Sequence, residues 1–392
     1  MNQRLLAVSV LLALAPTTQA GELIRSQRPI QGQYIVVFKP TSLTAPVGIA
    51  RNGSLDAAVD DATIELAAKH GLGVDRVFRS ALQGFVARGN ENSIARLLKD
   101  PRVAFVEEDG MSYPTATQSS ATWGLDRIDQ RDRPLNGTYI YDFFGSAVRA
   151  YVIDSGILAS HNDFGGRVLS GYTAIADGRG SSDCNGHGTH VAGTIGGATW
   201  GVAKSVRLVP VRVFGCTGGS SNSTIIAGID WVRTNAVKPA VANMSLGGGA
   251  SSAIDTATNN LSNSGVTVVV AAGNDNADAC NYSPARAAGA ITVGSTTNTD
   301  ARSSFSNYGT CLDIFGPGSS ILSTWYTSNT ATNTISGTSM ASPHVAGAAV
   351  LVLAADNAAS PVTVRSRLVN KASLGKLSGI NAGSPNALLY SR

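Results

Sequence analysis

Four short apolar runs, rich in β-branched residues, recur through the second half of this 392-residue sequence. They read AVRAYVID, RLVPVRVF, AVANMSL and GVTVVVAAG, and none of them alternates apolar with polar residues. Strands that are buried on both faces of a sheet have this composition. The stretches between them, HVAGTIGGA, NSTIIAGIDWVRTNA and SSAIDTATNNLSNSG, are typical of helices. Strands that alternate with helices predict an α/β fold, in which helices flank a mostly parallel sheet on both faces.

The first part of the chain differs in composition and is predicted to form a separate domain. Residues 21–115 hold 11 acidic side chains and no cysteine, whereas residues 116–392 hold 15 Asp and no Glu. The patterns QYIVVFKP, ALQGFVARG and VAFVEED predict strands, and SLDAAVDDATIELAAKHG and ENSIARLLKDP predict helices. We therefore expect a small α/β sandwich at 21–115. The irregular segment GMSYPTATQSSATWG would join it to a larger domain at 116–392.

Residues 1–20 have the pattern of a secretory signal peptide. Arg4 precedes an apolar stretch, and the small residues Thr18 and Ala20 lie where signal peptidase cleaves. The alternative, a lone membrane anchor, is disfavoured because this stretch is too short for a stable span. No later segment is long and apolar enough either, so we expect an exported protein that makes no membrane contact after cleavage.

Charge and cysteine content narrow the choice of partners. The formal net charge is +4, and Lys and Arg are scattered without a basic run, so nucleic acid is a poor candidate partner. Export implies an oxidising compartment, in which four cysteines predict two disulfides. The residues alone allow three pairings of Cys184, Cys216, Cys280 and Cys311. A metal site at these cysteines is disfavoured because they are far apart and form no C-x-x-C motif.

Polar or glycine-rich residues follow each of the four predicted buried strands. They are Asp154, Gly215, Ser245 and Asn274. Ligands of parallel sheets bind beyond the carboxyl ends of the strands, so this edge is where we expect the functional site.

Three stretches carry residues suited to nucleophilic catalysis at this edge. YVIDSGI contains Asp154 at a strand end, NGHGTHVAGT contains His187 at a helix start, and SGTSMASPHVAG contains Ser339 at the start of another helix. A serine hydroxyl needs an imidazole to take its proton, and a carboxylate orients the imidazole and stabilises its charged form. The helix start offers Ser339 its dipole and a backbone N–H for an oxyanion, and Gly337 allows a sharp turn there.

Alternative readings of these residues are weaker. Asn274 alone would be a turn residue, but beside the triad its amide can donate the second oxyanion hydrogen bond. His187 and His190 are spaced H-x-x-H, which lacks the glutamate of a zinc protease. GTSMA resembles the nucleophile elbow of an esterase, but the only downstream histidine is His344, in the same predicted helix.

The motifs VIDSGI, CNGHGTHVAGTIGG, VANMSLGGG, AAGNDN, SFSNYG and SGTSMASPHVAG together resemble the subtilisin superfamily, and within it the proteinase K and aqualysin branch. The order Asp154, His187, Ser339 is the subtilisin order. Residues 21–115 resemble the inhibitory propeptide of such proteases. The resemblance implies that Asp154, His187 and Ser339 form the catalytic triad and that Asn274 is the oxyanion donor. His190 and His344 are then packing residues. The chain has Ser155 where the family often has threonine, which keeps the hydroxyl.

The resemblance also implies a substrate cleft and two disulfides. Cleft residues would be Gly215, Gly218, Gly219, Ser245, Leu246, Gly247, Gly248, Ala271, Ala272 and Gly273. The segment GCTGGSS would pair as a strand with extended substrate. Disulfides would join Cys184 to Cys216 and Cys280 to Cys311.

Structural calcium is a further implication of the resemblance. One site would use Asp313 with the carbonyls of Ala288 and Ala290. A second would use Asp126, Asp129, Gln130, Asn136 and Thr138, a stretch whose alternative interpretation is a solvated acidic turn.

Together these features predict a secreted serine endopeptidase of broad specificity. It would be a monomer that cleaves extended polypeptides and that frees itself from its own propeptide between Thr115 and Ala116. The rival hypothesis is an inactive relative that only binds or inhibits, which the intact set of four catalytic residues disfavours.

Overall fold

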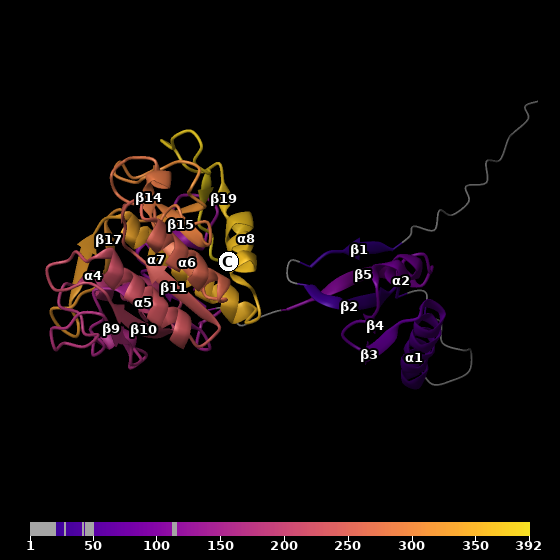
Figure 1. Ribbon diagram of the computed structural model, residues 1–392. Helices are drawn as coiled ribbons and strands as arrows, with labels where there is room; N and C mark the ends of the chain where they lie inside the picture. The colour runs from indigo at the N-terminus through magenta and orange to yellow at the C-terminus, as the bar shows by residue number, and fades with distance from the viewer. Residues whose placement is uncertain (1–20, 27–28, 41–42, 44–50, 112–115) are drawn as a thin grey trace, which may run out of the picture. The chain divides into compact units, whose positions relative to one another are not determined.

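The computed structural model describes residues 21–26, 29–40, 43, 51–111 and 116–392. The predicted signal peptide, residues 1–20, and the predicted processing residue Thr115 lie outside the described residues. The chain divides into two compact units, residues 1–113 and 114–392, called here the N-terminal unit and the C-terminal unit (Figure 1).

The N-terminal unit is a five-stranded sheet packed against two helices, in the order β1-β5-β2-β4-β3. Its elements are β1 (Glu22–Ile24), β2 (Pro29–Phe38), α1 (Arg51–His70), β3 (Gly73–Phe78), β4 (Gly84–Arg88), α2 (Glu91–Leu97) and β5 (Val103–Gly110). Val59 and Leu66 of α1 and Ile94 of α2 are fully buried against Val36 and Phe85 of the sheet. The three strands and two helices that the sequence predicts are present.

Two edge strands of this unit, β1 and β3, were not predicted. Their side chains are mostly exposed, so they lack the apolar pattern by which a buried strand is recognised. Helix α1 ends where the sequence indicates, because Gly71 has a φ of +65° and Leu72 N–H caps the Ala67 carbonyl at 2.9 Å.

The C-terminal unit is built on a nine-stranded sheet in the order β19-β20-β16-β15-β13-β11-β8-β10-β9. All neighbouring pairs in it are parallel except β19–β20. The strands are β8 (Arg149–Asp154), β9 (Tyr172–Thr173), β10 (Arg207–Arg212), β11 (Ala240–Met244), β13 (Thr267–Ala271), β15 (Ala290–Thr296), β16 (Ile314–Pro317), β19 (Ser373–Leu374) and β20 (Ala387–Leu388). The four predicted strands are β8, β10, β11 and β13, and they are adjacent at the centre of the sheet.

Helices cover both faces of this sheet, as the sequence predicts. Helices α4 (His187–Gly196), α7 (Thr338–Ala355) and α8 (Pro361–Lys371) pack on one face, with the short α3 (Trp123–Ile128). Helices α5 (Asn222–Asn235) and α6 (Ser252–Asn263) pack side by side on the other (Figure 1). Successive residues of β8 alternate between the two cores: Val152 contacts the α4–α7 side, and Ile153 contacts the α5–α6 side. Burial on both faces explains why these strands read as unbroken apolar runs.

Helix α7 runs through the middle of the larger core. Contrary to the expectation from the sequence, this helix is long and apolar enough to cross a membrane, and it alone among the described residues; 78% of it is buried inside the protein. That composition is equally typical of a helix at the centre of a globular core. It packs against β11, β13 and β15, and hydrogen bonds between Ser339 and Ser245 place its first turn just beyond the carboxyl end of β11.

Three small two-stranded antiparallel sheets complete the C-terminal unit. They pair β6 (Ala116–Ser119) with β7 (Thr138–Tyr141), β12 (Gly248–Gly249) with β14 (Tyr282–Ser283), and β17 (Ile321–Thr324) with β18 (Thr332–Ile335). The joining segment that was expected to be irregular therefore contains a strand, β6, and the start of α3. The prediction missed β6 because its residues, ATQS, are polar or small and half exposed.

Candidate active site

The carboxylate of Asp154 lies at the end of β8, one of the central strands, and is fully buried. Its two oxygens lie 2.8 and 2.9 Å from Nδ1 of His187, and Oδ1 also accepts the Ser155 N–H at 2.7 Å. A carboxylate can only accept, so Nδ1 carries the proton and donates it. The other ring nitrogen, Nε2, is then free to act as a base.

The turn that carries His187 depends on Gly186. This residue caps α4 with a φ of +105°, and a Cβ there would lie 2.5 Å from the ring of Trp325. Only glycine readily adopts that backbone conformation and also leaves room for the Trp325 ring. The glycine before the histidine is therefore a structural requirement of the site.

A buried aspartate, Asp183, ties this turn to the loop that follows β8. Its Oδ1 accepts the Ser155 hydroxyl at 2.9 Å and the Gly186 N–H at 3.0 Å. Its Oδ2 accepts the N–H of Thr189 at 2.9 Å and its hydroxyl at 2.6 Å. Sequence reasoning missed Asp183. Its position gave no capping signal, because it lies three residues before Gly186, the N-cap of α4.

The electrostatics around His187 favour its charged form. Burial by itself lowers the pKa of this imidazole, but the charge and hydrogen bonds of Asp154, with the nearby charge of Asp183, outweigh burial and raise the pKa above 6.5. An imidazolium formed here during a reaction is therefore stabilised.

The other two histidines of this region are held as neutral packing groups. Burial lowers the pKa of His190 and of His344 to about 4. His190 donates from Nε2 to the Ile321 carbonyl at 3.0 Å, and His344 donates from Nδ1 to the Met340 carbonyl at 2.8 Å. This is the role that the sequence interpretation gives them.

Ser339 is the second residue of α7 and docks against the end of β11. Its hydroxyl donates to the Ser245 carbonyl at 3.2 Å, and the Ser245 hydroxyl donates to the Ser339 carbonyl at 2.8 Å. The register pairs Asn243 with Val152, so Ser245 lies opposite Asp154. Ser339 and the Asp154–His187 pair are thus at the same sheet edge. The described contacts of the hydroxyl are with Ser245 rather than with His187, and catalytic hydrogen bonds commonly tighten only when substrate binds.

Asn274 lies three residues beyond β13 and is exposed. Its Oδ1 accepts the backbone N–H of Thr338 at 2.8 Å and the Thr338 hydroxyl at 2.9 Å. Because the oxygen end is held by these donors, Nδ2 is directed away from them and is available to a ligand. A Cβ at Gly337 would lie 3.6 Å from that Nδ2 and 3.6 Å from the Ser339 nitrogen.

Gly337 is needed for a reason other than the sharp turn that the sequence predicts. Its φ of 162° is extended backbone, which any residue adopts. The missing side chain matters instead, because it leaves open the space in front of the Asn274 amide and the Ser339 N–H.

The predicted cleft residues fall into buried and exposed groups. Ser245, Leu246, Ala271 and Ala272 are buried, Gly215 and Gly273 are half-buried, and Gly218, Gly219, Gly247 and Gly248 are exposed. The segment from Gly215 to Ser221 pairs with no strand among the described residues, so its predicted pairing with substrate stays a prediction. Gly218 and Gly219 have φ values of +77° and +73°, which no β-strand accommodates.

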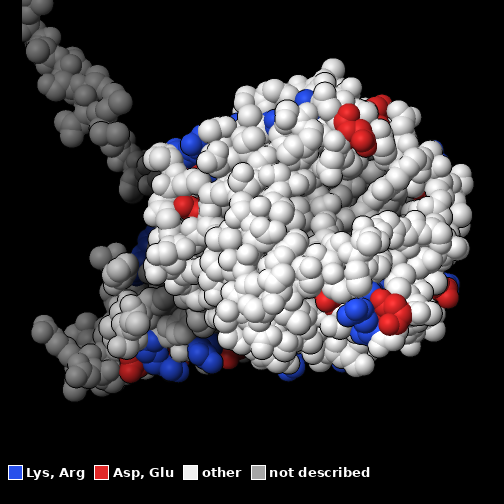
Figure 2. Space-filling model, turned by 90° about the vertical axis from the view of Figure 1, so that its left-hand side faces the viewer, with Lys and Arg blue, Asp and Glu red and all other residues white. Residues whose placement is uncertain are grey.

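The charge of the face that bears α4, β9 and β17 is low. Figure 2 shows uncharged side chains over most of this face, with Lys, Arg, Asp and Glu scattered toward its rim. This face therefore presents no large electrostatic field of either sign to a ligand.

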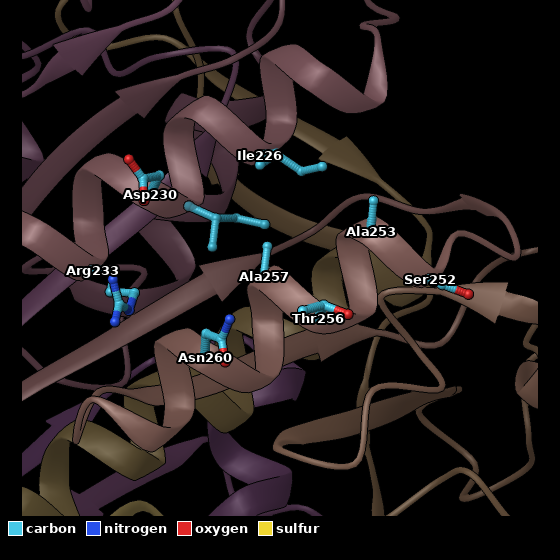
Figure 3. Close-up of a pocket in the computed structure, with 9 residues that line it drawn as sticks. Ile226, Asp230, Arg233, Ser252, Ala253, Thr256, Ala257 and Asn260 are labelled. Atoms are coloured by element: carbon cyan, nitrogen blue, oxygen red, sulfur yellow. The ribbon is translucent and has the colours of Figure 1, made fainter.

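A hollow lies between α5 and α6, on the other face of the sheet from α4 and α7 (Figure 3). Side chains from the two helices face each other across it, among them Ile226, Asp230 and Arg233 from α5 and Ala257 and Asn260 from α6. None of the predicted site residues lines this hollow.

Comparison with known proteins identifies the family. Residues 145–387, more than half of the chain, match the model of the subtilase family. This chain belongs to the subtilase family. Residues 33–113 match the peptidase inhibitor I9 family, so the subtilase carries its own inhibitor domain ahead of the catalytic one. It is a serine endopeptidase made as a zymogen.

Curated relatives match over nearly the whole chain. The extracellular serine proteinase of Thermus sp. (strain Rt41A) is 54% identical over 96% of this chain and 94% of its own. Alkaline serine exoprotease A of Vibrio alginolyticus is 48% identical over 98% of this chain and 72% of its own. A crystal structure of a cold-adapted subtilisin-like serine proteinase is 55% identical, with a TM-score of 0.68. It covers 70% of this chain and 99% of its own.

The disulfides of this subtilase join Cys184 to Cys216 and Cys280 to Cys311, the pairing that the resemblance implies. The first tethers the exposed Gly215–Ser221 segment to the turn ahead of His187. Asp177 lies beside that disulfide, but the sulfurs are bonded to each other and the carboxylate is ion-paired with Arg212 at 2.6 Å. These three residues are therefore no metal site.

Subtilases generally bind structural calcium, and the second predicted calcium site fits a cation. Asp126 and Asp129 are both buried, and Oδ1 of Asp129 has no hydrogen-bond partner. Burial, with the nearby charge of Asp126, raises the pKa of Asp129 to about 6. Two carboxylates with an unpartnered oxygen in a low-dielectric pocket are the donor set that a hard divalent cation needs.

Hydrogen bonds link the other predicted residues of that site to the turn between α3 and β7. Asp126 accepts the N–H of Gly137 at 2.6 Å and that of Asn136 at 3.2 Å. Asn136 Oδ1 accepts from the Thr138 N–H and hydroxyl, and Gln130 Nε2 donates to the Asp132 and Pro134 carbonyls. The oxygen end of Gln130 is therefore free of these bonds.

The first predicted calcium site, at Asp313, does not fit an ion in the same way. Oδ1 of Asp313 accepts hydrogen bonds from Nε of Arg365 at 2.8 Å and from its Nη2. The Ala288 carbonyl accepts a hydrogen bond from Nη1 of the same arginine at 3.0 Å. Ala290 is the first residue of β15. A guanidinium thus already bridges two of the three expected ligands.

Proposed function

We propose that this subtilase cleaves peptide bonds with Ser339 as nucleophile, His187 as general base and acid, and Asp154 as the group that orients His187. The single observation that supports this assignment best is the buried Asp154 carboxylate. It holds Nδ1 of His187 with both oxygens at the sheet edge against which Ser339 docks.

The reaction follows from which atoms are free. Nε2 of His187 takes the proton of the Ser339 hydroxyl as Oγ bonds to the carbonyl carbon of the substrate. The oxyanion that forms accepts hydrogen bonds from Nδ2 of Asn274 and from the Ser339 N–H at the start of α7. His187 then passes its proton to the leaving amine, an acyl-enzyme forms on Oγ, and water releases it by the same steps in reverse.

A serine-directed phosphonylating reagent tests the assignment and separates it from an inactive relative. The mature protein should be labelled at Ser339, and Asn274→Ala should slow the reaction without preventing it. Labelling at any other serine, or none, would contradict the proposal.

The substrate class follows from the cleft. Uncharged walls at residues 245–249 and 271–273 and an exposed glycine-rich segment at 215–221 favour an extended polypeptide with apolar or aromatic side chains and broad specificity. A mixed peptide library should show cleavage after many residue types. A strict requirement for Arg or Lys before the cleaved bond would refute this.

The N-terminal unit serves as intramolecular inhibitor and folding aid, and the enzyme removes it by cleavage between Thr115 and Ala116. That bond lies two residues from the division between the two compact units, and Ala116 begins β6, which pairs with β7. Cleavage there frees the inhibitor and leaves the β6–β7 pair intact. Purified Ser339→Ala should remain unprocessed, and maturation of that variant by itself would contradict self-cleavage.

The mature enzyme is an exported monomer, in keeping with the extracellular relative from Thermus, and has no nucleic-acid partner. Calcium binds at Asp126 and Asp129, with Gln130, Asn136 and Thr138 completing the site. There the ion compensates the charge of the two buried carboxylates and holds the turn between α3 and β7. Calorimetric titration of the mature protein should detect this site, and Asp129→Asn should abolish it.

A further inference from the structure

Arg365, on helix α8, contacts two of the three ligands that the sequence interpretation gives to a calcium ion. Its guanidinium donates from Nε at 2.8 Å and from Nη2 to one oxygen of Asp313, and from Nη1 at 3.0 Å to the Ala288 carbonyl. The other oxygen of Asp313 accepts the Thr292 N–H at 2.8 Å. Both carboxylate oxygens therefore already have donors. The side chain of Asp313 is only 10% exposed.

Charge balance explains why a guanidinium suits this place. Of the three expected ligands, only Asp313 carries a charge, and one carboxylate neutralises one guanidinium but leaves a divalent ion half-compensated. A calcium ion in contact with the same oxygens would also lie within a few ångströms of the Arg365 charge. At the second site, by contrast, Asp126 and Asp129 supply two negative charges and an unpartnered oxygen.

We propose that Arg365 is a built-in cation that replaces calcium at the Asp313 site. The covalently tethered guanidinium fastens α8 to residues that precede β16 and β15, two strands at the same end of the sheet. A chelator can remove calcium from the Asp126–Asp129 site, but it cannot remove this cation. The proposal does not depend on the catalytic assignment, since it concerns stability and ion count.

The test compares bound calcium and thermal midpoint in the mature protein after inhibition by a serine-directed sulfonyl fluoride. Wild type and Asp313→Asn should bind the same number of calcium ions by calorimetric titration, since the second site is common to both. In excess chelator, Arg365→Ala should lower the thermal midpoint by about 2–4 °C. Arg365→Lys, which keeps a charge there, should recover part of this loss.

Arg367 provides a matched control on the same helix. Its side chain is 42% exposed against 41% for Arg365, and it pairs with Asp356 at 2.7 Å, but Asp356 is 37% exposed. Arg367→Ala should therefore shift the midpoint little, because exposed ion pairs contribute little. The proposal is overturned if Asp313→Asn binds one calcium fewer than wild type, or if Arg365→Ala and Arg367→Ala shift the midpoint equally. Neither measurement relies on turnover, so a failure of the catalytic proposal would be seen separately, as absent labelling of Ser339.

Discussion

Replacing Asp183 by asparagine removes one charged oxygen from the network behind His187. On its Oδ1 side, Asp183 accepts three hydrogen bonds, from the Ser155 hydroxyl and from the N–H groups of Asn185 and Gly186. On its Oδ2 side it accepts two, from the N–H and hydroxyl of Thr189. The new amide NH2 group causes least damage on the Oδ2 side, where the Thr189 hydroxyl can turn to accept from it.

The magnitude follows from what is left unpaired. The buried N–H of Thr189 loses its acceptor, which costs about 1–3 kcal/mol. The hydrogen bonds that remain go to a neutral oxygen instead of a charged one, so each of them is weaker. We expect Asp183→Asn to lower the free energy of unfolding by about 3–5 kcal/mol.

Activity should change in a way that a purely structural role would not produce. The charge of Asp183 contributes to the raised pKa of His187, so its removal should lower that pKa. A base works only when it is unprotonated, so kcat/KM falls as the pH drops through the pKa of His187. In Asp183→Asn this acid limb should move to lower pH, while the maximal kcat falls because the histidine turn is less firmly held.

Denaturant unfolding of the inhibited enzyme and the pH profile of kcat/KM measure both effects. Asp278→Asn is the matched control: Asp278 is exposed and caps a single N–H, that of Cys280, at 2.9 Å. Asparagine caps equally well, so this change should cost less than about 0.5 kcal/mol. A loss below about 1 kcal/mol for Asp183→Asn, with an unmoved acid limb, would refute the reasoning.

Three further predictions concern other parts of the molecule. Asn274→Ala should lower kcat by about 10²–10³ with little change in KM, the loss known for the corresponding asparagine of subtilisin, and an unchanged kcat would remove Asn274 from the oxyanion site. Asp129 has a folded pKa of about 6 against 3.8 ordinarily, so its ionisation costs stability as pH rises from about 4 to about 6. In chelator at pH 7, Asp129→Asn should thus raise the free energy of unfolding by about 1–3 kcal/mol. With calcium present, the same change should lower the thermal midpoint. A variant less stable than wild type in chelator would contradict this. Gly186→Ala should cost more than about 2 kcal/mol, since its Cβ meets Trp325 at a φ of +105°, and near-normal stability in thermal unfolding would show that the turn can relax.

Much of the fold could be predicted because its signals are local. Unbroken β-branched runs identify β8, β10, β11 and β13, because strands buried on both faces need apolar side chains in every position. The edge strands β1, β3 and β9 and the short strand β6 carry no such pattern. They are strands because a neighbouring strand offers hydrogen-bond partners, and that neighbour is known only once the chain is folded.

The candidate site divides in the same way. The residues proposed for the chemistry could be named from local motifs, since Asp154, His187, Asn274 and Ser339 each lie at the end of a predicted strand or the start of a predicted helix. The choice of His187 rather than His190 as the base rests on the resemblance to the subtilisin superfamily, and it is part of the proposed mechanism.

The surroundings of those residues depend on contacts that form only in the folded chain. Asp183 closes its network with side chains up to 28 positions away, Ser339 docks on Ser245 94 positions away, and Arg365 reaches Asp313 across 52 positions. Motifs specify which groups are present, but a partner at such a separation is selected by packing, burial and charge balance in the folded chain. For this reason the sequence predicted an ion at Asp313, and the structure placed an arginine there.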